Sequence, residues 1–216
     1  MKTNVSVAGV LKQGAPDDFV YIDEYIEDCV IDVKYWGTDN FVGRPIDGYD
    51  RPLVMLGKKA AEACVQAAGI LRRRGLLMKI FDGYRPQCAV DDIVQWLSDE
   101  WDIRRKPIHY PNVDKKDFLR LGYIMPKSVH SRGNAVDLTL VDEKTKHELD
   151  MGTIFDFMDP RSYITTRAIT PAQKQNRECL RNAMCASGFA EYLSEWWHYS
   201  LVREPHPDSY FNFPVR

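Results

Sequence analysis

The chain has 216 residues, of which 44% are hydrophobic, 28% charged and 12% aromatic. These proportions are typical of a folded globular protein and exclude a disordered, collagen-like or membrane-bundle chain. Lysine and arginine total 29 against 31 acidic residues, a net charge of −2, and without a basic excess we expect no nucleic-acid partner. A chain of this length buries about 70% of its unfolded surface, so one domain can fold without a disulfide or a structural metal.

The N-terminal residues predict a short lead-in and give an expectation about location. Residues 1–18 are expected to be loose, because Gly14 and Pro16 interrupt any pattern, and a single domain is expected over 19–216. The lead-in has no apolar run long enough for a signal-peptide core, and no apolar run in the sequence has the length of a transmembrane helix. We therefore expect a cytoplasmic protein without a membrane partner; a periplasmic location would require a signal segment removed ahead of Met1.

The cysteines argue against a disulfide scaffold. They are an odd number and contain no CxxC pair. We expect most of them to be small buried hydrophobic residues. They are Cys29, Cys64, Cys88, Cys179 and Cys185.

Three helices are predicted in chain order. Apolar residues recur at three- and four-residue spacing over 58–74, and Gly75 follows as a stop signal. A second helix is expected to begin near Pro86. Its inner face is expected to carry Ala89, Ile93, Trp96, Leu97 and Trp101. The third begins at Thr170, where TPAQ combines an N-cap threonine, a first-turn proline and a capping-box glutamine, and it runs to Gly188.

Five strands alternate with these helices. The β-branched segment CVIDVKY predicts a strand over 29–35, and LLMKIF predicts a buried strand over 76–81. NAVDLTLV at 134–141 is the next, and short strands at 189–192 and 196–202 complete the chain. Because the order has no strict βαβ repeat, we predict an α+β single domain with a largely antiparallel central sheet flanked by helices.

One long segment is expected to be a surface excursion. Residues 103–129 are rich in proline, lysine and aspartate, and such loops are uncommon in compact domains unless they frame a site. His109 lies in this segment and, like His147 and His206, has no matching partner pattern. We expect all three histidines at the surface.

Side chains that can bind a metal concentrate in SVHSRGNAVD and EWWH. His130 and Asp137 are joined by a glycine-containing turn into a strand, so they can converge on one ion. Positions i and i+3 of a regular strand face opposite sides, so joint action of Glu195 and His198 requires a bend or bulge. His130, Asp137 and His198 would supply three ligands and leave a fourth position for water, as in catalytic zinc sites.

Each of these pieces has a simpler explanation when taken alone. A lone histidine is more often a hydrogen-bonding residue than a metal ligand, and HxxxxxxD occurs by chance in many proteins. EWWH could be a half-buried aromatic strand, and Arg85 in GYRP could tie down its own turn. Their occurrence in one chain and in this order favours a metal site.

Together the segments resemble the SxHxxGxAxD and ExxH signature of the zinc D-Ala-D-Ala metallopeptidases, a fold shared with the N-terminal signalling domain of hedgehog proteins. Within that group the chain is most similar to the VanX-type D-alanyl-D-alanine dipeptidases. The segments that carry the resemblance stand in family order and extend over most of the chain. They are DVKYWGTDNFVG (32–43), KIFDGYRP (79–86), SVHSRGNAVDLTL (128–140), DMGTIFD (150–156) and EWWHY (195–199).

The resemblance implies a zinc dipeptidase that hydrolyses D-Ala-D-Ala to two D-alanines, with one Zn²⁺ per chain. It implies that His130, Asp137 and His198 are the zinc ligands. Glu195 matches the general base that takes a proton from the zinc-bound water. Arg85 matches the arginine that steadies the peptide carbonyl as its oxygen gains negative charge, and an arginine stays charged at any working pH.

The resemblance also implies how the dipeptide is held. Ser128 and Asp156 match residues that bind the free ammonium end of the substrate, and Tyr35 is expected to assist. A buried carboxylate favours a free ammonium, since an N-acylated substrate would leave it unpaired. The small dipeptide is the expected partner, and self-association into a homo-oligomer stays open. The implied role is glycopeptide resistance or recycling of cell-wall peptides.

Other functions remain open at this point. A D,D-carboxypeptidase acting on peptidoglycan stem peptides would share the zinc site, and Asp156 favours the dipeptidase over it. A non-catalytic zinc-containing module that binds wall peptides would be expected to lack the base or the arginine, and Glu195 and Arg85 are both present. A metal-free aromatic binding domain would leave His130 and Asp137 without a purpose.

Overall fold

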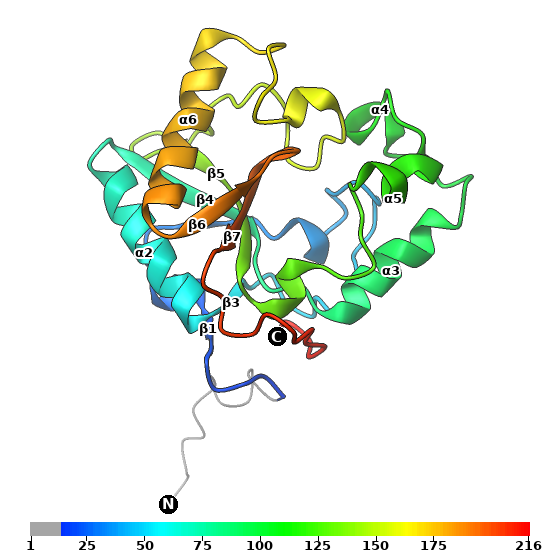
Figure 1. Ribbon diagram of the computed structural model, residues 1–216, viewed down its shortest axis with the longest axis horizontal. Coiled ribbons are helices and arrows are strands. Elements are labelled where there is room, and N and C mark those ends of the chain that lie inside the picture. The colour runs from blue at the N-terminus through cyan, green and yellow to red at the C-terminus, as the bar shows by residue number, and fades with distance from the viewer. Residues whose placement is uncertain (1–13) are drawn as a thin grey trace, which may run out of the picture.

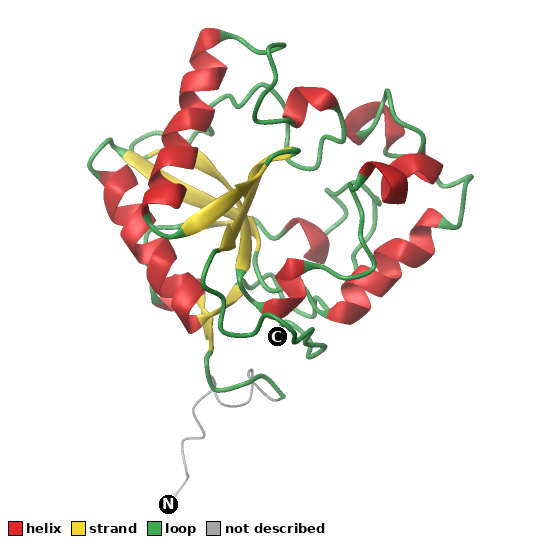
Figure 2. Cartoon of the chain, viewed as in Figure 1, coloured by secondary structure: helices red, strands yellow, loops and turns green. Residues whose placement is uncertain are grey.

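A five-stranded mixed sheet forms the centre of the computed structural model, which describes residues 14–216. The strand order is β2 (Val30–Ile31), β4 (Leu76–Asp82), β5 (Ala135–Asp142), β7 (Glu195–Leu201) and β6 (Phe189–Tyr192). Only the β2–β4 pairing is parallel within this sheet. A separate antiparallel pair joins β1 (Phe19–Tyr21) to β3 (Met55–Gly57). The predicted α+β domain with a largely antiparallel sheet is confirmed (Figure 2).

Helices lie on both sides of this sheet. α2 (Lys58–Arg72) and α6 (Pro171–Ala186) contact each other and the sheet strands. α3 (Gln87–Leu97) and the one-turn helices α4 (Lys106–His109) and α5 (Phe118–Leu121) gather on the opposite side of the molecule (Figure 1). Short 3₁₀ turns connect the elements: η1 (Ile22–Glu24), η2 (Lys34–Trp36), η3 (Lys115–Asp117), η4 (Val129–Arg132) and η5 (Pro160–Ser162). In residues 14–216, no helix combines the length and apolarity needed to cross a membrane.

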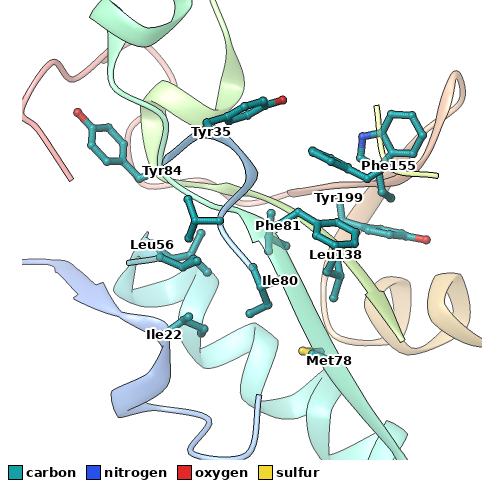
Figure 3. Close-up of a cluster of buried hydrophobic side chains, with 14 of the residues drawn as sticks. Ile22, Tyr35, Leu56, Met78, Ile80, Phe81, Tyr84, Leu138, Phe155 and Tyr199 are labelled. Atoms are coloured by element: carbon teal, nitrogen blue, oxygen red, sulfur yellow. The ribbon is translucent and has the colours of Figure 1, made fainter. Parts of the chain in front are cut away.

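The sheet and α2 enclose the apolar core. Met78 and Ile80 of β4 lie beside Leu138 of β5 in the interior (Figure 3). The Phe81 ring stacks on Phe155 at a centroid distance of 4.7 Å. Complete burial of such a side chain contributes about 1.5–3 kcal/mol, so this cluster holds the strands in the register that positions the site.

The long helices and the core strands follow the sequence prediction to within a few residues. α6 carries the predicted capping box, in which the Thr170 side chain accepts from Gln173 N and the Gln173 side chain accepts from Thr170 N. The lead-in expected over 1–18 lies largely outside the described residues, and its boundary with the domain stays a prediction.

The strand predicted over 29–35 is mostly wrong. It is reduced to Val30–Ile31, and Lys34–Trp36 forms a 3₁₀ turn instead. The side chain of Asn40 explains the turn, because its amide nitrogen donates to the main-chain oxygens of Lys34, Gly37 and Arg44. This local bond network competes with strand pairing and brings Tyr35 into the interior.

The segment 103–129 is only partly a surface excursion. Tyr110 and Phe118 are fully buried and meet edge to face at 5.1 Å. The expectation that His109 lies at the surface is wrong, since it is buried. Trp101 also differs from its prediction: α3 ends at Leu97, and Trp101 is 92% exposed.

The cysteines depart from expectation as well. Cys64 is buried in the face of α2, but the other four are half-buried or, at Cys185, exposed. The periodicity of apolar residues in helices and strands predicted the core residues well, but it gave little information about the burial of the individual cysteines.

A buried arginine fixes the loop that follows β5. The Arg177 guanidinium of α6 donates to the main-chain oxygens of Met151 at 2.7 Å, Arg161 at 3.0 Å and Tyr163 at 3.2 Å. Burial lowers the pKa of Arg177 to about 10, which leaves it charged at neutral pH. These bonds tie residues 150–163 to α6.

We predict that Arg177→Met lowers the free energy of unfolding by about 3 kcal/mol, because one buried and two part-buried hydrogen bonds to main-chain carbonyls are lost. Urea denaturation monitored by circular dichroism measures the change. Lys174→Met, one turn earlier on the exposed side of α6, is the control and should change stability by less than about 0.5 kcal/mol. Equal stability of the two variants would contradict the anchoring role of Arg177.

Candidate metal centre and active-site cavity

Three potential metal ligands converge from two strands and one turn. Asp137 of β5 and His198 of β7 are direct register partners in the antiparallel pair, so their side chains lie on one face of the sheet. His130 comes from η4, whose N-cap is Ser128. Asp137 Oδ1 lies 3.0 Å from His198 Nδ1, and Asp137 Oδ2 lies 3.3 Å from His130 Nε2. Within the described chain, these three buried residues are the group whose ligand atoms all lie within 4.8 Å of one another.

Hydrogen bonds on the far side of each imidazole orient the ligand nitrogens. His130 Nδ1 lies 2.7 Å from the main-chain oxygen of Gly83, and since a carbonyl can only accept, Nδ1 carries the proton. His130 Nε2 is then a lone pair, directed at His198 Nδ1 at 3.1 Å. His198 Nε2 lies 2.9 Å from Ser200 Oγ, which can accept its proton. This arrangement of outer hydrogen bonds is typical of metal-binding histidines.

The donor set fits a divalent transition metal. Two imidazole nitrogens and one carboxylate oxygen leave further coordination positions open, as catalytic metal sites do. Burial opposes ionisation of Asp137, but His130 and His198 outweigh it and hold the pKa of the carboxyl well below its usual range. A deprotonated carboxylate is the form that binds a cation.

The bend needed at the start of β7 is present. Tyr192 pairs with Glu195, whereas the preceding residue, Glu191, pairs with Tyr199. One step along β6 therefore spans four residues of β7, and the intervening segment bulges. The bulge allows Glu195 and His198 to line the same cavity, which confirms the geometric requirement inferred from the sequence.

Glu195 is held in an environment that favours its neutral form. Burial raises the pKa of this carboxyl well above its usual range, and the carboxylates of Asp137 and Asp156 add to the shift. A carboxyl with a raised pKa can both accept and return a proton near neutral pH.

Arg85 lies beside the ligand cluster and is anchored by an aspartate that the sequence analysis did not single out. Its Nε donates to Asp82 Oδ2 at 2.9 Å, and its Nη2 lies 3.4 Å from Asp137 Oδ2. Asp82 also accepts from Tyr49 Oη at 2.7 Å. A break in the β4–β5 register next to Asp82 aims it at Arg85. The sequence signal for Asp82 was its place as the first residue of the predicted turn DGYRP.

Asp156 and Tyr35 are hydrogen-bonded to each other beside Arg85, whose Nη2 lies 3.4 Å from Tyr35 Oη. Tyr35 Oη donates to Asp156 Oδ2 at 2.9 Å, and the Arg85 guanidinium lies 4.7 Å from the centre of the Tyr35 ring. Asp156 has a φ of +54°, a left-handed conformation that costs about 1–3 kcal/mol outside glycine. Burial, followed by repulsion from Asp137, raises the pKa of Asp156 well above its usual range.

A single cavity of about 280 Å³ brings together all eight residues predicted from the sequence. Ser128 is among them, although its Oγ accepts from His130 N at 3.3 Å and so also caps η4. Phe41, Ile93 and Trp197 contribute to the apolar part of the wall. The eight site residues are Tyr35, Arg85, Ser128, His130, Asp137, Asp156, Glu195 and His198.

Comparisons with known proteins match nearly the whole chain. The Peptidase_M15 family model, described as D-ala-D-ala dipeptidase, matches residues 16–216. The D-alanyl-D-alanine dipeptidase of Enterococcus faecalis is 42% identical over 197 residues, covering 91% of this chain and 98% of that protein. The enzyme of the same name from Streptomyces coelicolor is 42% identical over 198 residues, covering 92% and 98%.

A solved structure gives a weaker match. The vancomycin-resistance D,D-pentapeptidase VanY, crystallised as a mutant in complex with Zn(II), is 14% identical with a TM-score of 0.42, covering 73% of this chain and 78% of that one. The family match, by contrast, extends over nearly all of the chain. The chain belongs to the D-Ala-D-Ala dipeptidase family of peptidases.

Proposed function

We propose that this protein hydrolyses the dipeptide D-Ala-D-Ala to two D-alanines and that it uses one zinc ion per chain. The observation that carries the proposal is the convergence of the His130, Asp137 and His198 ligand atoms in the same cavity as Glu195 and Arg85. The names of relatives that are 42% identical support the choice of substrate.

Zinc would be held by His130 Nε2, His198 Nδ1 and a carboxylate oxygen of Asp137. When bound, it supplies a Lewis acid that lowers the pKa of a coordinated water from about 15.7 toward 7. Two nitrogen ligands and one oxygen ligand suit zinc, and the outer hydrogen bonds to Gly83 and Ser200 fix the two imidazoles.

The residues around the ligands have complementary roles in hydrolysis. Glu195 accepts a proton from the attacking water and passes it to the nitrogen of the leaving D-alanine. Arg85 directs a fixed positive charge at the amide oxygen as that oxygen becomes negative. The bond to Asp82 holds the guanidinium in place, so little reorganisation is needed during the reaction.

The same cavity would also hold the free ammonium group of the substrate. Asp156 supplies a carboxylate there, Ser128 a hydroxyl, and Tyr35 orients the Asp156 carboxylate through their hydrogen bond. A charged ammonium beside Asp156 would restore the ionised form that burial disfavours. Removal of free D-Ala-D-Ala would serve glycopeptide resistance or recycling of wall peptides.

The proposal is tested by measuring D-alanine release from D-Ala-D-Ala by zinc-loaded protein, with N-acetyl-D-Ala-D-Ala in parallel. We expect release from the free dipeptide and at least about a hundredfold lower kcat/KM for the acetylated one, which leaves Asp156 unpaired. Comparable cleavage of both substrates would indicate a carboxypeptidase. Release from neither substrate with zinc bound would contradict hydrolysis and favour a wall-peptide binding module.

We predict that Glu195→Gln lowers kcat by about 10²–10⁴-fold, because the amide cannot accept the proton of the water. Zinc content should equal that of the wild type, since Glu195 is not among the three proposed ligands. Steady-state kinetics and metal analysis measure the two effects. Glu178→Gln, an exposed position on α6, is the control. Retention of more than about a tenth of wild-type turnover would reject Glu195 as the base.

A further inference from the structure

The buried histidine of α4 contacts the main chain of the segment that carries Asp156. His109 Nδ1 lies 3.2 Å from the main-chain oxygen of Asp156. The main-chain oxygen of His109 accepts from Met158 N at 2.8 Å. The two bonds lie on the C-terminal side of Asp156, before and after Phe157. The first joins residues that are 47 positions apart in the sequence.

The partners of His109 define a single neutral tautomer. Arg105 Nη2 lies 3.0 Å from His109 Nε2, and since a guanidinium can only donate, Nε2 is the acceptor. The carbonyl of Asp156 can only accept, so Nδ1 carries the proton. Arg105 is itself held by the main-chain oxygen of Asn40 at 2.9 Å and by Asp39 at 3.0 Å.

Burial keeps this imidazole uncharged. It lowers the pKa of His109 to about 4, so the ring is neutral throughout the physiological range. The hydrogen bond to Asp156 therefore has the same donor and acceptor at every working pH.

The Asp156 peptide needs such a support. Its left-handed φ of +54° is uncommon outside glycine, although aspartate adopts it more readily than most residues with a side chain. The direction of its carboxylate, which accepts from Tyr35 Oη, follows from that backbone conformation. On the N-terminal side, the Phe155 ring is fixed against Phe81 and Trp197. On the C-terminal side, the carbonyl bond to His109 fixes the peptide plane.

We infer that His109 is a positioning residue for substrate binding. Its Nδ1–H holds the Asp156 peptide in the conformation that directs the carboxylate toward the ammonium group of the bound substrate. His109 does not line that cavity itself. The inference rests on the proposed function insofar as Asp156 binds the ammonium group, but the geometric part can be tested without activity.

The kinetic test compares His109→Ala with His109→Asn, whose amide nitrogen can replace Nδ1 as donor. We expect His109→Ala to raise KM for D-Ala-D-Ala about tenfold, the equivalent of one lost hydrogen bond. kcat should change little, because the interaction of Asp156 with the ammonium group stabilises the bound substrate and the transition state equally. His109→Asn should restore most of the KM, and His147→Ala, an exposed histidine, should match the wild type.

A change in KM that His109→Asn does not reverse, or a parallel loss of kcat and melting temperature in both variants, would mean that His109 is only structural. An unchanged KM in His109→Ala would overturn the inference directly. In either case activity of the wild-type protein on D-Ala-D-Ala would leave the proposed function intact.

A crystal structure of zinc-loaded His109→Ala gives a readout that does not depend on activity. We expect Asp156 to leave the left-handed region or its hydrogen bond with Tyr35 to break, while His109→Asn keeps both. An unchanged Asp156 in His109→Ala would overturn the inference, even if wild-type protein fails to cleave the dipeptide and the proposed function is rejected.

Discussion

Two imidazole nitrogens and a carboxylate that converge on one point form the interaction on which the rest of the structure depends. His130 Nε2 and His198 Nδ1 are 3.1 Å apart. The proton of His130 is on Nδ1, which donates a hydrogen bond to the carbonyl of Gly83. Two lone pairs at this separation would repel each other, so the geometry suits a proton or a cation between the two nitrogens. The β5–β7 register and the η4 turn hold them there, and a bound cation would be attracted by both nitrogens and by the carboxylate of Asp137.

The charges around the three ligand residues also favour a bound cation. Asp82, Asp137, Asp156 and Glu195 are gathered around Arg85, which makes ion pairs with Asp82 and Asp137. Burial and the neighbouring carboxylates raise the pKa of Glu195 and Asp156 well above their usual range. A divalent cation at the cluster and an ammonium group beside Asp156 would each offset part of this negative charge.

Local patterns predicted those parts of the fold whose cause is local. The capping box at Thr170 and the apolar periodicity of α2 located their helices because both act within a few residues of the chain. The eight site residues were assigned through motifs in family order, and the structure places them in one cavity; their individual roles stay proposals. A bend or bulge in β7 was inferred from the spacing of Glu195 and His198 on the condition that the two side chains act together.

The failures have causes that lie outside the segments from which the predictions were made. The strand predicted over 29–35 gave way to a turn because Asn40 binds carbonyls that no pattern in CVIDVKY reveals. His109 was expected at the surface because no partner pattern in the sequence pointed to it. Its partners are Arg105, the N-cap residue of α4, and the carbonyl of Asp156, which is distant in sequence. Contacts between distant segments leave no periodicity in the sequence.

Zinc titration of metal-free protein by calorimetry, with Asp137→Asn in parallel, tests the central claim most directly. The account predicts one zinc per wild-type chain, with two imidazole nitrogens and one carboxylate oxygen at about 2.0–2.2 Å in the crystal structure of the complex. Asp137→Asn should lose stoichiometric binding, because the neutral amide is a poorer ligand. Wild-type protein that binds no zinc, or a variant that binds it equally tightly, would contradict the account.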